Sequence, residues 1–138
     1  MITHLIQKLV LTLAITFALG THALEPIKIG TTQSLTGHYS EQGTEQLRGL
    51  QMWAADVNAR GALLGRTVEI IYYDDGSRDA GTVAGFEKLL DDDKADLLVG
   101  PYSSSLTLKA SLVAEANNTP MVSTAASAEE IWNRGLKN

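Results

Sequence analysis

Residues Gly100 to Leu106 read Gly-Pro-Tyr-Ser-Ser-Ser-Leu, and they decide the fold that we expect. An apolar run from Ala95 to Val99 leads directly into this stretch, and a helical spacing of apolar residues follows it. This order predicts a strand, a tight turn rich in hydroxyl groups and the start of a helix. In open α/β folds such a turn lies at the carboxyl end of a strand, where the positive end of a helix binds anionic groups. The stretch therefore indicates an α/β protein with a candidate anion site.

The serines of this turn have two interpretations. Ser103, Ser104 and Ser105 supply hydroxyl donors at the place where an anion would bind. Serine is also a preferred N-cap residue, so the same side chains could serve only to cap the helix. From this stretch alone capping is the favoured interpretation, because capping serines are common and binding serines are not.

Strand and helix patterns alternate along the rest of the chain with short connections. Residues 67–73 are β-branched and aromatic, as in a typical strand, and apolar residues recur at three- and four-residue steps in the helical segments. The run at 95–99 is almost wholly apolar, as a strand covered on both faces should be. Alternation of this kind predicts right-handed crossovers and one parallel sheet. We expect strands over residues 26–32, 67–73, 95–99 and 121–124, helices over 44–59 with Thr44 as N-cap, 80–90 and 106–117, and a short helix near 129–132.

The carboxyl ends of these strands should form one polar rim, whose residues do not make a catalytic set. Gly30 opens no Gly-x-Gly-x-x-Gly fingerprint, and the chain has neither a phosphate-loop motif nor a Gly-x-Ser-x-Gly elbow. Asp74 and Asp75 could hold a ribose, but a turn at an exposed strand end is the favoured interpretation. We therefore expect a protein that is not an enzyme, with a nucleotide-dependent enzyme as a rival hypothesis.

Composition also bears on metal and nucleic-acid chemistry. His38 is the only histidine after residue 23, and the chain has no cysteine, so we expect no metal, no disulfide and no cofactor. Lys8 is the one charged residue before residue 24, so the rest of the chain carries ten Lys and Arg against sixteen Asp and Glu. This acidic balance argues against a nucleic-acid partner, which favours a basic face.

Residues 1–23 have the pattern of a secretory signal peptide. Lys8 gives a weakly positive start, residues 9–19 are apolar, and Thr21-His22-Ala23 fits a small-residue cleavage site. The apolar part is shorter than the roughly twenty residues that span a bilayer, so a membrane anchor is the less favoured alternative. We therefore expect an exported protein.

Six short motifs follow one another along the chain between residues 26 and 134. They are Ile27-Lys28-Ile29-Gly30, Leu35-Thr36-Gly37, Gln42-Gly43, Asp56 to Gly61, Tyr73-Asp74-Asp75 and Gly100 to Ser105. With the N-terminal signal pattern, they resemble the type I periplasmic binding proteins, and more narrowly the substrate-binding components of branched-chain amino-acid and amide ABC transporters. The resemblance implies a parallel-sheet, Rossmann-like α/β first lobe, a second lobe across a hinge, a small amino-acid or amide ligand and a membrane permease as partner. It also implies a monomer that performs no chemistry.

The resemblance assigns the head group of the ligand to the candidate anion site. Ser104, with Ser103 beside it, matches a family serine that contacts the ligand carboxylate. Ala125 matches a residue whose backbone carbonyl accepts from the ligand ammonium, and Ser127 matches a threonine that contacts the head group. We therefore expect Ser104 and Ser127 to converge from adjacent strand ends, where each charge-assisted hydrogen bond contributes about 1.5–3 kcal/mol.

Two residues depart from the family pattern around the ligand side chain. Gln42 aligns with an aromatic residue of some relatives, and Tyr102 stands where a relative has an aliphatic residue. Leucine specificity therefore does not follow from the resemblance. Tyr39 could restore an aromatic wall, or its hydroxyl could simply lie in water on a loop.

Members of that family run to several hundred residues, whereas this chain ends at Asn138. We therefore expect residues 24–138 to be the N-terminal part of the first lobe, without the second lobe and without the segment that returns to complete the first. An unfilled sheet edge and an exposed apolar helix face should result, and the isolated chain should bind free amino acids weakly or not at all. A ligand-sensing receptor or regulator on the same fold, and a gene fragment without function, are the alternatives.

Overall fold

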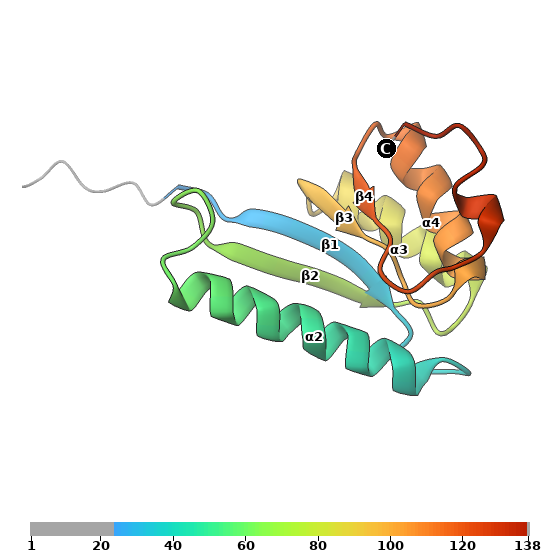
Figure 1. Ribbon diagram of the computed structural model, residues 1–138, viewed down its shortest axis with the longest axis horizontal. Helices are drawn as coiled ribbons and strands as arrows, with labels where there is room; N and C mark the ends of the chain where they lie inside the picture. Colours follow the sequence, from blue (N-terminus) through green and yellow to red (C-terminus); the bar gives the residue numbers. More distant parts are fainter. Residues whose placement is uncertain (1–23, 138) are drawn as a thin grey trace, which may run out of the picture.

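The computed structural model describes residues 24–137, so the expected signal peptide at residues 1–23 lies outside the described residues. Its centre is a parallel sheet of four strands in the order β2-β1-β3-β4 (Figure 1). These strands are β1 (Ile27–Gln33), β2 (Val68–Asp74), β3 (Leu97–Val99) and β4 (Met121–Val122). The predicted parallel α/β fold is therefore confirmed.

Helices lie on both faces of the sheet (Figure 1). α2 (Ser40–Ala59) runs along one face, and α3 (Asp79–Asp91) and α4 (Ser104–Ala116) pack on the other. A 3-10 turn, η1 (Glu129–Ile131), follows β4 and contacts α4, which confirms the short helix expected there. The two helical layers enclose two separate apolar cores.

The first core lies between β1, β2 and α2. Ile27 and Ile29 point to the same face of β1, as alternate strand residues do, and pack with Ala54 of α2 and Val68 of β2. The second core lies between the opposite face of the sheet and the helices α3 and α4, and its buried members are Phe86, Leu89, Leu98, Ala110 and Ala114. Together the cores place the strand ends from which the following loops start.

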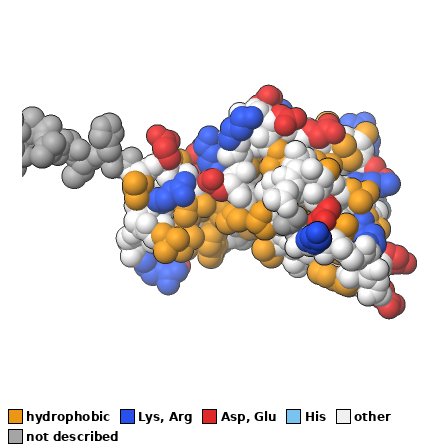
Figure 2. All heavy atoms as spheres, turned by 90° about the horizontal axis from the view of Figure 1, so that it is seen from above, with side chains coloured by type: hydrophobic (Ala, Val, Ile, Leu, Met, Phe, Trp, Pro, Cys, Tyr) orange, Lys and Arg blue, Asp and Glu red, His pale blue; other side chains and the backbone are white. Residues whose placement is uncertain are grey.

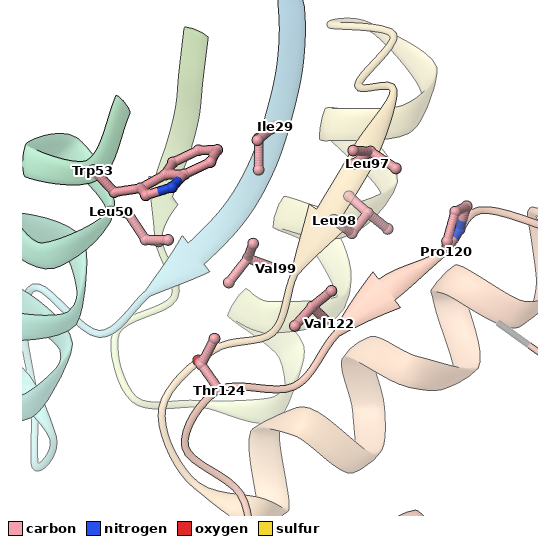
Figure 3. Close-up of a pocket in the computed structure, with 9 residues that line it drawn as sticks. All are labelled: Ile29, Leu50, Trp53, Leu97, Leu98, Val99, Pro120, Val122 and Thr124. Carbon is pink, nitrogen blue, oxygen red and sulfur yellow. The ribbon is translucent and has the colours of Figure 1, made fainter. Parts of the chain in front are cut away.

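On the α2 side, β3 and β4 remain uncovered within residues 24–137, which leaves an apolar trough of about 300 Å³ (Figure 3). Trp53, Leu97 and Val122 in its walls are 42, 40 and 63% exposed. Trp53 leaves part of the apolar face of α2 exposed, as expected. The expectation that the third strand is covered on both faces holds only in part: Leu98 is packed on one face, whereas on the other face Val99 packs against the first core and Leu97 is exposed. The trough is lined by Ile29, Leu50, Trp53, Leu97, Leu98, Val99, Pro120, Val122 and Thr124.

Several element boundaries differ from the predicted ones. α2 begins at Ser40 rather than at Thr44, because the N–H of Ser40 donates to the carbonyl of Gly37 (3.3 Å) and so starts the helix without a side-chain cap. β3 begins at Leu97 rather than at Ala95, whose N–H donates to the end of α3 instead. α4 begins two residues earlier than predicted, and β4 is two residues long rather than four.

The surface carries charges of both signs. On the face that Figure 2 shows, Lys and Arg are interspersed with Asp and Glu, and hydrophobic side chains lie between them. Such a face offers no continuous basic stripe to a nucleic acid. Across the part of the chain that the structure describes, no helix combines the length and the hydrophobicity needed to cross a membrane.

Candidate functional site

The loops that follow the strands come together at the carboxyl end of the sheet. We call these loops, residues 34–39, 75–78, 100–103 and 123–128, the rim. β1 and β3 are neighbours in the sheet, and the helices that follow them, α2 and α4, lie on opposite faces. Strand order therefore reverses between β1 and β3, and open α/β sheets bind their ligands at such a point.

Asp75 is a buried carboxylate within the rim. Its side chain is 1% exposed and accepts hydrogen bonds from the hydroxyls of Thr32 (3.1 Å) and Ser34 (2.7 Å) and from the N–H of Ser77 (2.8 Å). The predicted turn is present, but the predicted exposure of Asp75 is wrong, because these donors satisfy the carboxylate inside the protein. Because protein donors already occupy the carboxylate of Asp75, this residue is not placed to bind the hydroxyls of a ribose.

Asp74 holds the loop that follows β1. Its carboxylate accepts from the N–H groups of Leu35 (2.9 Å) and Gly76 (2.8 Å) and from the hydroxyl of Thr36 (2.7 Å). Partial burial raises the pKa of Asp74, but the hydrogen bonds from Thr36, Gly76 and Leu35 outweigh that effect and leave the pKa below its ordinary value. Asp74 is therefore ionised at neutral pH and fixes one side of the rim.

Ser103 is the N-cap of α4. Its hydroxyl oxygen accepts from the N–H of Leu106 at 3.4 Å and lies 3.2 Å from the hydroxyl of Ser105. The φ angle of Ser103 is +80°, in a region that favours glycine, so the surrounding structure imposes this turn on a serine. The capping interpretation is confirmed for Ser103.

Ser104 has a different role from its neighbour. Its hydroxyl oxygen accepts hydrogen bonds from the backbone N–H groups of Ser127 and Ala128, each at 3.1 Å. The structure thus brings Ser104 and Ser127 together, although through the backbone of Ser127 rather than through two side chains. Because the hydroxyl is the acceptor in both bonds, it keeps its own hydrogen for a further partner.

Gln46, which the sequence analysis missed, joins three parts of the site. Its amide nitrogen donates to the carbonyl of Gly100 (2.9 Å) and to the hydroxyl of Thr124 (2.6 Å), so it ties α2 to the ends of β3 and β4. Gln42 is exposed one turn nearer the start of α2, on the same helix face, and Ala125 is half-buried directly after Thr124. The four-residue spacing from Gln42 is the signal that could have identified Gln46.

Aromatic rings stand beside the serines. The rings of Tyr39 and Tyr102 meet edge to face, with centroids 5.5 Å apart and planes at 61°, and His38 meets Tyr39 at 4.9 Å and 63°. The N–H of Tyr39 donates to the hydroxyl of Ser77 at 3.0 Å, which fastens this loop to the turn after β2. The structure thus brings Tyr39 and Tyr102 into one aromatic wall.

The chemical character of the rim is that of a binding surface. It offers hydroxyls, backbone amides at the start of α4 and aromatic rings, while the carboxylates of Asp74 and Asp75 are held by protein donors. Among residues 24–137, no group of three His, Cys, Asp or Glu side chains is placed to hold a metal ion. These groups can orient a small polar solute.

The sequence model of the periplasmic binding protein family matches residues 26–135. This match covers most of the chain, so the chain belongs to the periplasmic binding protein family. Members of this family bind solutes and are not enzymes. The family resemblance noted in the sequence and its α/β first-lobe fold are therefore confirmed.

Individual relatives agree with the family match. An amino acid binding protein of Pseudomonas aeruginosa is 32% identical over 134 residues, which cover 96% of this chain and 36% of the relative. A Leu/Ile/Val-binding protein of Escherichia coli K12 is 31% identical over 113 residues, which cover 82% of this chain and 30% of the relative. The chain thus spans about a third of the length of these curated relatives.

A solved structure shows the same arrangement. The branched-chain amino acid transporter substrate-binding protein LivJ of Streptococcus pneumoniae, crystallised with isoleucine, superimposes with a TM-score of 0.74 at 27% identity. The superposition covers 77% of this chain and 30% of that protein. The four-stranded sheet and its helices therefore correspond to one part of a longer binding protein.

Proposed function

We propose that this chain forms the first lobe of the solute-binding component of an ABC importer and captures a small amino acid or amide-like solute in the periplasm. The relatives named above bind amino acids, among them leucine, isoleucine and valine. The observation that carries the proposal is the junction of Ser104 with Ser127 and Ala128. It sets a hydroxyl donor and the positive end of α4 at one point of the rim.

The carboxylate of the solute would bind at the start of α4. The hydroxyl of Ser104 would donate to it, and the first N–H groups of the helix would add the positive end of the helix dipole. Ser103 and Ser127 flank this position, and the backbone carbonyl of Ala125 would accept from the ammonium of the solute. Each charge-assisted hydrogen bond would contribute about 1.5–3 kcal/mol.

Export, partner and oligomeric state belong to the same proposal. Residues 1–23 would direct export as a signal peptide, a membrane permease would receive the solute, and the protein would act as a monomer. The described rim is a single surface, so it can contact only one side of a solute. We therefore expect this chain alone to bind weakly, with the remaining contacts supplied by a second lobe in the longer relatives.

An NMR titration tests the proposal, because even weak binding moves amide signals. The full chain, labelled with ¹⁵N, is titrated with leucine, alanine and glutamine. The amide signals of residues 103–106 and 125–128 should move together. Ser104→Ala should weaken binding by at least about tenfold, since it removes a hydrogen bond to a charged group.

Two further variants separate the hydroxyl from the fold around it. Ser104→Thr keeps a hydroxyl and should keep most of the affinity. Ser105→Ala removes the exposed neighbouring hydroxyl, which among residues 24–137 contacts only Ser103 through a hydrogen bond, and should weaken binding much less than Ser104→Ala does. The proposal fails when no solute moves the rim signals, or when Ser104→Ala and Ser105→Ala behave alike.

A further inference from the structure

We propose that Tyr39 and Tyr102 form an aromatic wall that selects a carboxylate solute with an aromatic ring over one with an aliphatic side chain. The inference rests on the proposed function, because it names the class of solute that the same rim prefers. It starts from the contact between the two rings, which come from loops 63 residues apart in the chain.

The wall stands where the side chain of an anchored solute would lie. Tyr102 directly precedes Ser103 and Ser104, and the hydroxyl of Ser104 is the proposed donor to the carboxylate. Tyr39 comes from the opposite loop, immediately before α2, and its ring meets that of Tyr102 at 5.5 Å. Both tyrosines are half-buried, so each ring packs against the protein and still leaves part of its surface open.

Hydrogen bonds within the protein support the Tyr39 side of the wall. The hydroxyl of Ser77 accepts from the N–H of Tyr39 at 3.0 Å and donates to the carbonyl of Thr36 at 2.8 Å. The N–H of Ser77 in turn donates to the buried carboxylate of Asp75 at 2.8 Å. This chain of hydrogen bonds fixes the backbone of Tyr39, so less backbone freedom is lost when a solute binds.

Ring geometry gives the reason for the preference. An aromatic ring has a negative face and a positive edge, so rings attract one another edge to face. His38 already meets Tyr39 in this way at 4.9 Å and 63°, and a ring of the solute could continue the same arrangement. Such a contact adds about two- to tenfold in affinity beyond the apolar area that it buries. A saturated ring of similar shape buries comparable area without this contribution.

The test compares three amino acids that share one head group. The full ¹⁵N-labelled chain is titrated with phenylalanine, cyclohexylalanine and leucine. Phenylalanine should bind about two- to tenfold more tightly than cyclohexylalanine. The amide signals of Tyr39 and Tyr102 should move together with that of Ser104.

Substitutions of Tyr102 test whether the aromatic wall causes the preference for phenylalanine over cyclohexylalanine. Tyr102→Leu should bring phenylalanine and cyclohexylalanine to equal affinity, whereas Tyr102→Phe keeps the ring and should keep the preference. Tyr72→Leu makes the same change at an exposed tyrosine of β2 outside the rim, and it should leave the preference unaltered. The spread of amide signals shows that each variant is folded, and Tyr102→Phe carries the test where Tyr102→Leu does not fold.

The outcomes separate this inference from the proposed function. Equal affinity for phenylalanine and cyclohexylalanine, or tighter binding of leucine, with the same rim signals moving, overturns the aromatic preference and leaves solute capture in place. A preference that survives in folded Tyr102→Leu, or is lost in Tyr102→Phe, also overturns it. Failure of all three amino acids to move the rim signals overturns both proposals.

Discussion

The hydroxyl oxygen of Ser104 lies 3.1 Å from the backbone nitrogen of Ser127, and this bond joins the first residue of α4 to the loop after β4. The same oxygen accepts from the N–H of Ala128, which is the N-cap residue just before η1. One side chain thus positions a loop and the turn that follows it. The proposed carboxylate site consequently depends on a residue that is also part of the local architecture.

Ser104→Ala should loosen that loop. It leaves the N–H groups of Ser127 and Ala128 without their acceptor, and a hydrogen bond of this kind contributes about 0.5–1.5 kcal/mol. Amide hydrogen exchange at these two positions should therefore accelerate by about two- to tenfold. Ser105→Ala is the matched control and should leave both rates unchanged. Unaltered exchange in Ser104→Ala would show that the loop is held by other contacts.

Asp75→Asn should destabilise the fold. The buried carboxylate of Asp75 accepts from Thr32, Ser34 and Ser77, and an amide places a donor where an acceptor is needed. We expect a loss of about 2–3 kcal/mol in the free energy of unfolding, measured with urea. Asp56→Asn, which breaks only an exposed ion pair, should cost less than about 1 kcal/mol. Similar losses in the two variants would contradict the structural role given to Asp75.

Asp74 should make the stability depend on pH in the acid range. Its pKa in the folded chain lies below the ordinary value of 3.8, so its ionised form stabilises the fold above that value. This contribution is lost as the pH falls through the folded pKa. The difference in unfolding free energy between the unaltered chain and Asp74→Asn should therefore be constant near neutral pH and shrink below about pH 4. Urea unfolding across that range measures it, and a difference that stays constant would rule out the lowered pKa.

Gly43 and Gly49 of α2 should respond in opposite ways to alanine. A Cβ at Gly43 would overlap the backbone of Ser34, which cannot move aside as a flexible side chain can, so Gly43→Ala should cost about 1–3 kcal/mol. A Cβ at Gly49 meets nothing within 4 Å, and alanine there should stabilise the helix by about 0.5–1 kcal/mol. Urea unfolding of both variants checks the signs. A loss at Gly49 as large as that at Gly43 would remove the steric explanation.

Much of the fold could be predicted because apolar spacing is a local property. The alternation of Ile27 and Ile29 and the apolar run ending at Val99 identify strands directly, and the short connections predict a parallel sheet. Exposure could not be predicted in the same way. Trp53 lies on the apolar stripe of α2, yet it is 42% exposed among the described residues, since its burial depends on contacts beyond its own helix.

The candidate site was only partly predictable for a similar reason. An Asp-Asp-Gly stretch predicts a turn from local sequence alone. The burial of Asp75 could not be predicted in this way, because it depends on donors such as Ser34, which lies 41 residues away. Capping is a local preference of serine, which explains why Ser103 followed the prediction. The bonds from Ser104 to the loop after β4 join distant segments, and here the family resemblance, rather than local pattern, indicated that Ser104 and Ser127 meet.

The pairs of neighbouring strands differ in the number of paired residues, and the two halves of the rim therefore differ in stiffness. β1 and β2 pair along seven residues, whereas β1 and β3 pair along three and β3 and β4 along two. A long ladder of hydrogen bonds resists local opening more than a short one does. The loops at 34–39 and 75–78 thus stand on a stiff support, and those at 100–103 and 123–128 stand on a compliant one. A solute bound on the rim would rest on a stiff half and a compliant half, so the compliant half, which carries the serines, would adjust to the shape of the solute.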